Sequence, residues 1–213
     1  MVSSSAHRLR QLVKGRAPDP LRAHGAWVYL LLSILAGALT ALGRGPLAPV
    51  LAGTAFAGAF LLAGGLAVRG RQRTRRLLGG LLVSTIAVGL ALLSGADPMF
   101  LRFGLVALFP ACAAAFLAAR NGYHSPPALA LGVCALVLAA PCAACAGGAS
   151  LPGMGLLVLL LLPFFAWRTT RLGTALRRDG GLTRAALRQR GLVEALLALG
   201  WTAVAVGLVH LLA

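Results

Sequence analysis

Seven long apolar stretches, separated by short segments that hold nearly all of the charge, constrain this chain more than any single motif. A helix needs about 20 predominantly apolar residues to cross a bilayer, within a range of about 17 to 25. Of the 213 residues, 59% are hydrophobic and only 11% are charged, whereas a soluble domain carries about 25% charged residues. The pattern predicts an all-α, polytopic membrane helix bundle and excludes a soluble enzyme, a secreted module and a disordered chain. The predicted spans are about 26–43, 47–68, 77–95, 99–119, 127–147, 151–167 and 191–212.

The placement of the basic residues predicts the orientation of these spans. Lys and Arg mark the cytoplasmic loops of membrane proteins. With the N-terminus cytoplasmic and the C-terminus outside, all 20 basic residues except Arg44 and Arg102 fall on the inner side. Removing one central span would move the basic loop 168–190 to the outer face. The same placement accounts for the net charge of +16 without nucleic acid as a partner.

Two basic segments are neither spans nor tight turns. Residues 1–25 form a cytoplasmic N-terminal segment with an interfacial amphipathic helix predicted at 7–16, and residues 26–213 form the helical bundle. The loop 168–190 is expected to hold two short amphipathic helices, broken at Asp179-Gly180-Gly181. Both segments are expected to rest on anionic inner-leaflet lipids, although simple anchoring of the topology explains them equally well. Small residues such as Gly53 and Ala57 favour close helix packing and would also permit a helix–helix oligomer.

Residues with chemical potential gather on the predicted cytoplasmic side. Glu194 is the only acidic residue in or near a span apart from Asp97, and an ionisable group at membrane depth is a functional-site hypothesis. Its expected ion-pair partner is Arg188 or Arg190. Arginines suit phosphate or carboxylate groups, and a His and a Glu could act as acid and base. The hypothesis is a pocket for an amphiphilic anionic molecule; the alternative is a set of ordinary loop residues without mutual contact. The candidate residues are His24, Trp27, Arg120, His124, Arg168, Arg171 and Glu194.

Two short strings resemble a known family. His24-Gly25-Ala26-Trp27, at the start of the first span, resembles the opening of the YwiC-like family of bacterial membrane proteins. Arg190-Gly191-Leu192-Val193-Glu194 is similar to a basic-Gly-x-x-Glu signature near that family's C-terminus. Ala23 stands where family members often have an acidic or amide residue, which argues against a proton relay at that position. The resemblance implies a multi-pass protein of the bacterial inner membrane and implies no particular reaction.

The cysteines and the acidic residues bear on cofactors. Cys142 and Cys145 have the Cys-x-x-Cys spacing of redox proteins, near the outer end of the fifth span. Small apolar packing is the alternative role for cysteines in an Ala-rich run. No metal is expected at these thiols, because the histidines are not arranged around them. The scattered acidic residues also disfavour Mg²⁺-dependent diphosphate chemistry, and no cofactor is expected.

Three classes of function remain open from the sequence, so whether the chain is an enzyme is undecided. The first is a metal-independent membrane enzyme that transfers or modifies a lipid, with the anionic head group held at the inner face. The second is a small carrier or permease, which is disfavoured for polar solutes because few polar residues, such as Ser84, Thr85 and Thr202, lie deep in the spans. The third is an accessory membrane subunit that binds a partner protein through faces of small residues.

Overall fold

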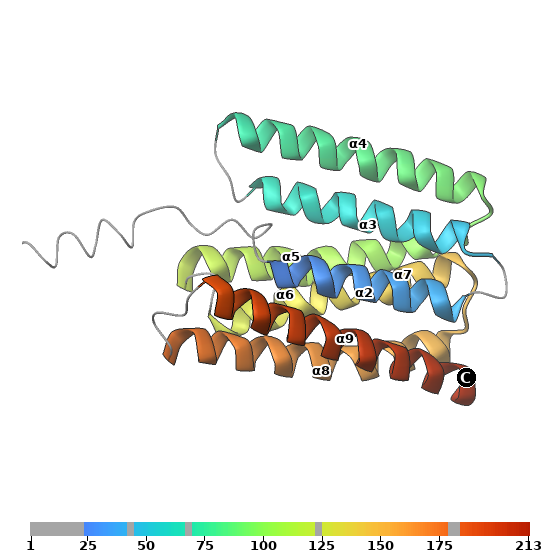
Figure 1. The fold of residues 1–213 in the computed structure, drawn as a ribbon. Helices are drawn as coiled ribbons and strands as arrows, with labels where there is room; N and C mark the ends of the chain where they lie inside the picture. The colour runs from blue at the N-terminus through green and yellow to red at the C-terminus, as the bar shows by residue number, and fades with distance from the viewer. Residues whose placement is uncertain (1–23, 42–44, 67–69, 122–124, 179–183) are drawn as a thin grey trace, which may run out of the picture.

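All regular structure in the described part of the chain is helical. The structure, a computed structural model, describes residues 24–41, 45–66, 70–121, 125–178 and 184–213. Figure 1 shows the helices side by side, running along a common direction. Six helices are long and apolar enough to cross a membrane, which confirms the predicted polytopic helical bundle. The helices are α2 (His24–Thr40), α3 (Leu47–Leu66), α4 (Arg71–Leu93), α5 (Phe100–Asn121), α6 (Pro126–Val137), α7 (Ala139–Ala146), α8 (Leu151–Arg178) and α9 (Arg184–Leu212).

The helix ends sort the arginines to one side of the bundle. The first residues of α2, α4, α6 and α9 lie at the same end as the last residues of α3, α5 and α8 (Figure 1). Every arginine of these described helices except Arg102 belongs to this end, which we call the basic end. The C-terminus lies at the opposite end from the start of α2 (Figure 1), as an odd number of crossings requires.

The short helix α2 occupies the middle of the bundle. It contacts α3, α6, α7, α8 and α9, and its fully buried residues Leu30 and Ala36 belong to a core shared with Val137, Leu161 and Phe165. With 17 residues, it is about 26 Å long. It is shorter than the six other membrane-spanning segments. Its neighbours cover most of its surface, so its core contacts hold it in place.

The fifth predicted span is one membrane crossing made of two helices. α6 and α7 meet at Leu138 within the span Pro126–Ala146. Pro141 explains the break, because it lacks an N–H and its ring clashes with the carbonyl of the residue four positions earlier, Val137. Gly37 of α2 lies against the Ala140 carbonyl so closely that a Cβ at position 37 would overlap it. This contact of small residues fixes α7 against the central helix.

α3 and α4 form a tight hairpin through small residues. Gly80, Ala87 and Ala91 are the buried residues of α4, and Ser84 on the same face donates a hydrogen bond of 3.0 Å to the Ala55 carbonyl of α3. A Cβ at Gly80 would lie 2.7 Å from the Gly58 carbonyl oxygen. Such close backbone approach through small residues is a common way for membrane helices to associate. The opposite side of α4 is exposed along its length.

The described parts of the basic segment 168–190 are helical, as expected, but they continue α8 and α9 and are not two separate short helices. α8 continues without interruption to Arg178, and α9 begins at Arg184, seven residues before the predicted span. The hydropathy pattern marks where the apolar stretch ends, but Arg, Leu, Ala and Gln are good helix formers and extend the helix beyond it. The predicted break at 179–181 and the interfacial helix at 7–16 lie outside the described residues.

Candidate functional site

An ion pair joins α8 and α9 near the basic end. The Arg168 Nε donates a hydrogen bond of 2.6 Å to Glu194 Oε2, and Arg168 Nη2 lies 2.5 Å from Glu194 Oε1. The exposed fractions of the two side chains are 15% and 23%. This bidentate arrangement is the strongest geometry for an arginine–carboxylate pair. The sequence suggested Arg188 or Arg190 as the partner; the structure shows that the carboxylate reaches across to α8.

Tyr29 brings the central helix to this ion pair. Its ring is buried and stacks on Phe165 of α8, with the ring centroids 4.6 Å apart and an interplanar angle of 28°. Its hydroxyl lies beside the Thr169 side chain and within electrostatic range of Glu194 and Arg168. Thr169 in turn donates a hydrogen bond of 2.8 Å to the Phe165 carbonyl. The sequence marked Tyr29 only as an interfacial aromatic residue and did not identify Thr169.

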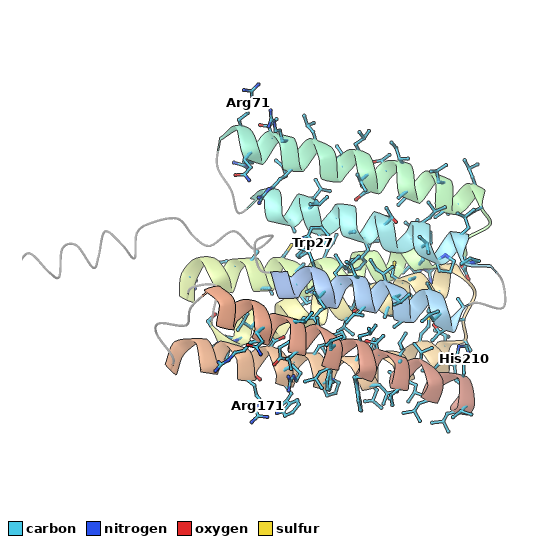
Figure 2. All side chains as sticks on the ribbon, viewed as in Figure 1. Trp27, Arg71, Arg171 and His210 are labelled. Atoms are coloured by element: carbon cyan, nitrogen blue, oxygen red, sulfur yellow. The ribbon has the colours of Figure 1, made fainter. Side chains whose placement is uncertain are left out.

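An aromatic residue holds the neighbouring arginines. The Arg168 and Arg171 guanidinium carbons lie 5.4 Å and 5.1 Å from the centroid of the half-exposed Trp167 ring. A cation within about 6 Å of an aromatic centroid is attracted by the ring quadrupole. Arg171 projects from α8 away from the bundle (Figure 2). Arg168 is therefore directed inward to Glu194, and Arg171 is directed outward.

An open hollow lies next to Glu194 on α9. It has a volume of about 270 Å³ and is open on one side, a shallow depression and not an enclosed pocket. Its walls combine a cation, a carboxylate, an amide and an apolar side chain, and they come from two successive turns of one helix. The lining residues are Gln189, Arg190, Val193 and Glu194.

The structure separates Trp27 and Arg120 from this site. Trp27 lies on the side of α2 that faces α3 (Figure 2), where its ring meets the edge of Phe60 at a centroid distance of 5.2 Å. Arg120 lies over the Phe116 ring of its own helix at 5.1 Å, and α5 packs chiefly on α6 and α7. The side chain of His24 and all of His124 lie outside the described residues. Of the seven candidates, Arg168, Arg171 and Glu194 are shown together.

The Cys-x-x-Cys pair occupies a packed interior. Cys142 and Cys145 are free and buried, in a cluster of small side chains with Ala52 and Ala144. The Cys142 thiol donates to the Phe100 carbonyl at 3.4 Å. These contacts favour the packing role over redox chemistry. Within the described ranges, no three His, Cys, Asp or Glu side chains lie close enough to hold a metal ion.

The chain matches no protein-family model, no curated protein and no solved structure in the comparisons made with it. The function is therefore argued from the geometry of the site. That geometry offers positioned charges beside an open hollow at one end of a membrane bundle. Such an arrangement can bind a charged head group while an attached apolar chain stays in the membrane.

Proposed function

We propose that this membrane protein binds an amphiphilic anionic molecule at the basic end of the α8–α9 pair. The observation that carries the proposal is the hollow beside Glu194, whose carboxylate is held by Arg168. The described part of this neighbourhood holds three arginines, Arg168, Arg171 and Arg190, and one carboxylate, Glu194, so its net charge is positive. Guanidinium groups bind phosphate and carboxylate through paired hydrogen bonds, which supports an anionic head group.

The surface next to the hollow supports an apolar tail. Val193, Leu197 and Val204 are exposed by 50%, 47% and 50%. At 3.6 residues per turn these three side chains follow one face of α9 away from the basic end. A molecule with its head group at Arg190 would therefore find a continuous apolar strip for its chain. Its polar and apolar parts would meet protein surfaces of the same character.

The resemblance to the YwiC-like family supports a related proposal, namely that the chain is a member of that family in the bacterial inner membrane. Both strings that carry the resemblance lie at the basic end: one opens α2, and the other spans Arg190 to Glu194 on α9. The second string includes three of the four residues that line the hollow. With basic residues inside by the usual rule, the hollow would face the cytoplasm.

A polar-solute carrier is less well supported. Among the described residues, Ser33 and Thr202 are the buried polar side chains, and Thr202 donates its hydroxyl to the Ala198 carbonyl of its own helix. A pathway for an ion or a sugar requires more polar groups along its length. An amphiphile that moves along an apolar face requires none.

The proposal is tested by mass spectrometry of amphiphiles that co-purify with the protein in mild detergent. The wild type is compared with Arg190→Gln, with Glu194→Gln and with the matched control Arg102→Gln at the opposite end. We expect one anionic amphiphile in the wild type and in the control, and a loss of at least about tenfold in Arg190→Gln, since charged hydrogen bonds contribute about 1.5–3 kcal/mol. Equal retention in all four proteins contradicts the proposal. A stoichiometric partner protein without any amphiphile also contradicts it, and favours an accessory subunit.

A further inference from the structure

The exposed side of α4 combines two cations with an apolar stripe. Arg71 and Arg75 are exposed and lie one helical turn apart. Further along α4, the exposed fractions of Leu78, Leu82 and Ile86 are 62%, 62% and 52%. At 100° per residue these five side chains fall within about 80° of one another around the helix. They form one strip, which we call the outer face of α4, that is cationic at the basic end and apolar toward the other end.

Protein packing leaves this strip uncovered. The buried residues of α4, Gly80, Ala87 and Ala91, lie on the opposite side and face α3. Figure 2 shows Arg71 at the edge of the molecule, pointing away from the other helices. By the same spacing, Arg73 and Arg76 lie on the side of the helix that faces α3. The Cβ of Arg76 would lie 3.2 Å from a Cβ added at Gly65 of α3.

The charge on the outer face has no acidic counterpart in the described structure. The two described acidic residues are Asp97, at the end of the bundle opposite α4's first turn, and Glu194, which pairs with Arg168. Arg71 and Arg75 also lie at a helix N-terminus, where the helix dipole already favours an anion over a cation. An anion between the two guanidinium groups would balance their charge and would interact favourably with the helix dipole.

We propose that the outer face of α4 is a binding site for one anionic phospholipid. The phosphate lies between Arg71 and Arg75, whose side chains are close enough at this spacing to share one anion. The acyl chains lie along Leu78, Leu82 and Ile86, which extend about 12 Å down the helix from Leu78 to Ile86. The site is separate from the hollow on α9 and stands or falls independently of the proposed function.

Native mass spectrometry of delipidated protein in detergent, titrated with phosphatidylglycerol, tests the site. The test variant is Arg71→Gln with Arg75→Gln, and the matched control is Arg73→Gln, which removes one charge from the other side of the same turns. We expect the first lipid to bind about tenfold to thirtyfold more weakly to the double variant, from about 1 kcal/mol for each cation near the surface. The control is expected to bind within about threefold of the wild type, and helical circular dichroism checks that each variant is folded.

Three results overturn the proposal. One is unchanged phosphatidylglycerol binding to the double variant. Another is equally tight binding of phosphatidylcholine to the wild type. The proposed selectivity rests on charge alone, so a lipid without net charge must bind more weakly than phosphatidylglycerol. The third is displacement of the lipid by glycerol phosphate at a similar concentration, which would assign the site to a free phosphate.

Discussion

Trp201 of α9 donates its indole N–H to the carbonyl of Leu160 in α8, at a distance of 2.9 Å. The carbonyl that Pro163 leaves without a helical N–H donor is that of Leu159, four positions earlier, so the indole binds the next carbonyl along the helix. The same indole stacks on Phe164, with the ring centroids 5.0 Å apart. Trp201 therefore fixes α9 against α8 at the height of the proline.

Replacing Trp201 by Phe keeps an aromatic ring and removes the hydrogen bond. We expect the free energy of unfolding in detergent to fall by about 0.5–1.5 kcal/mol. The control is Trp167→Phe, which also exchanges an indole for a phenyl ring and keeps a ring beside Arg168 and Arg171, but removes no hydrogen bond to a carbonyl of the neighbouring helix. Unfolding by sodium dodecyl sulfate, followed by circular dichroism, measures both variants. A smaller loss for Trp201→Phe than for the control would contradict the role assigned to this bond.

The Arg168–Glu194 pair is tested by a double-mutant cycle. Arg168→Gln and Glu194→Gln each leave the other charge without its bidentate partner, and each is expected to lower the free energy of unfolding by about 1–3 kcal/mol. The double variant removes both charges, so its loss is expected to be at least about 1 kcal/mol smaller than the sum of the two single losses. Additive losses would show that the pair contributes no coupling.

The contact between α3 and α4 is tested at two adjacent glycines. Gly80→Ala places a methyl group against the Gly58 carbonyl and the Leu62 nitrogen, both at 2.7 Å from the new Cβ. We expect a loss of about 1–3 kcal/mol in the free energy of unfolding. Gly79 has no described atom within 4 Å of an added Cβ, so Gly79→Ala is expected to be neutral or to stabilise the helix by up to about 1 kcal/mol. Equal effects at both positions would be inconsistent with the packed seam.

The orientation of the bundle is tested by cysteine labelling in intact cells. In a variant without native cysteines, Met99→Cys places a thiol between α4 and α5, at the end opposite the basic end, and Thr74→Cys places one in the first turn of α4. If the basic end faces the cytoplasm, a membrane-impermeant maleimide labels position 99 in intact cells and position 74 only after permeabilisation. The reverse pattern would invert the assigned orientation.

The fold could be predicted from the sequence because length and hydropathy act locally. A run of apolar residues must form a helix in the bilayer, whichever helices surround it. The limits of α8 and α9 were harder to predict, because helix propensity carries both helices past the apolar stretch. The break at Leu138 follows from Pro141, a signal that the sequence contains.

The candidate site could be predicted only in part. The topology predicts that Arg168, Arg171 and Glu194 lie at the same end of the bundle. It does not predict which face of its helix each residue occupies. Trp27 therefore turned out to face Phe60 on α3, whereas Tyr29, two residues later, faces the ion pair. Residues two apart on a helix point in nearly opposite directions, so the helix arrangement had to be known before either could be assigned. The i, i+4 spacing of Phe165 and Thr169 was a usable signal that both residues share a face.

The central place of α2 determines the order in which the bundle can assemble. α2 precedes α6, α7, α8 and α9 in the chain, yet it packs against all four of them. The hydrogen bond between His210 and the Leu39 carbonyl spans 171 positions of the chain. The α3–α4 hairpin, by contrast, is built from consecutive helices and can pair as soon as α4 enters the membrane. Because a chain is synthesised from its N-terminus, the contacts of α2 with α9 can form only after α9 has been made, later than the first contacts of the α3–α4 hairpin.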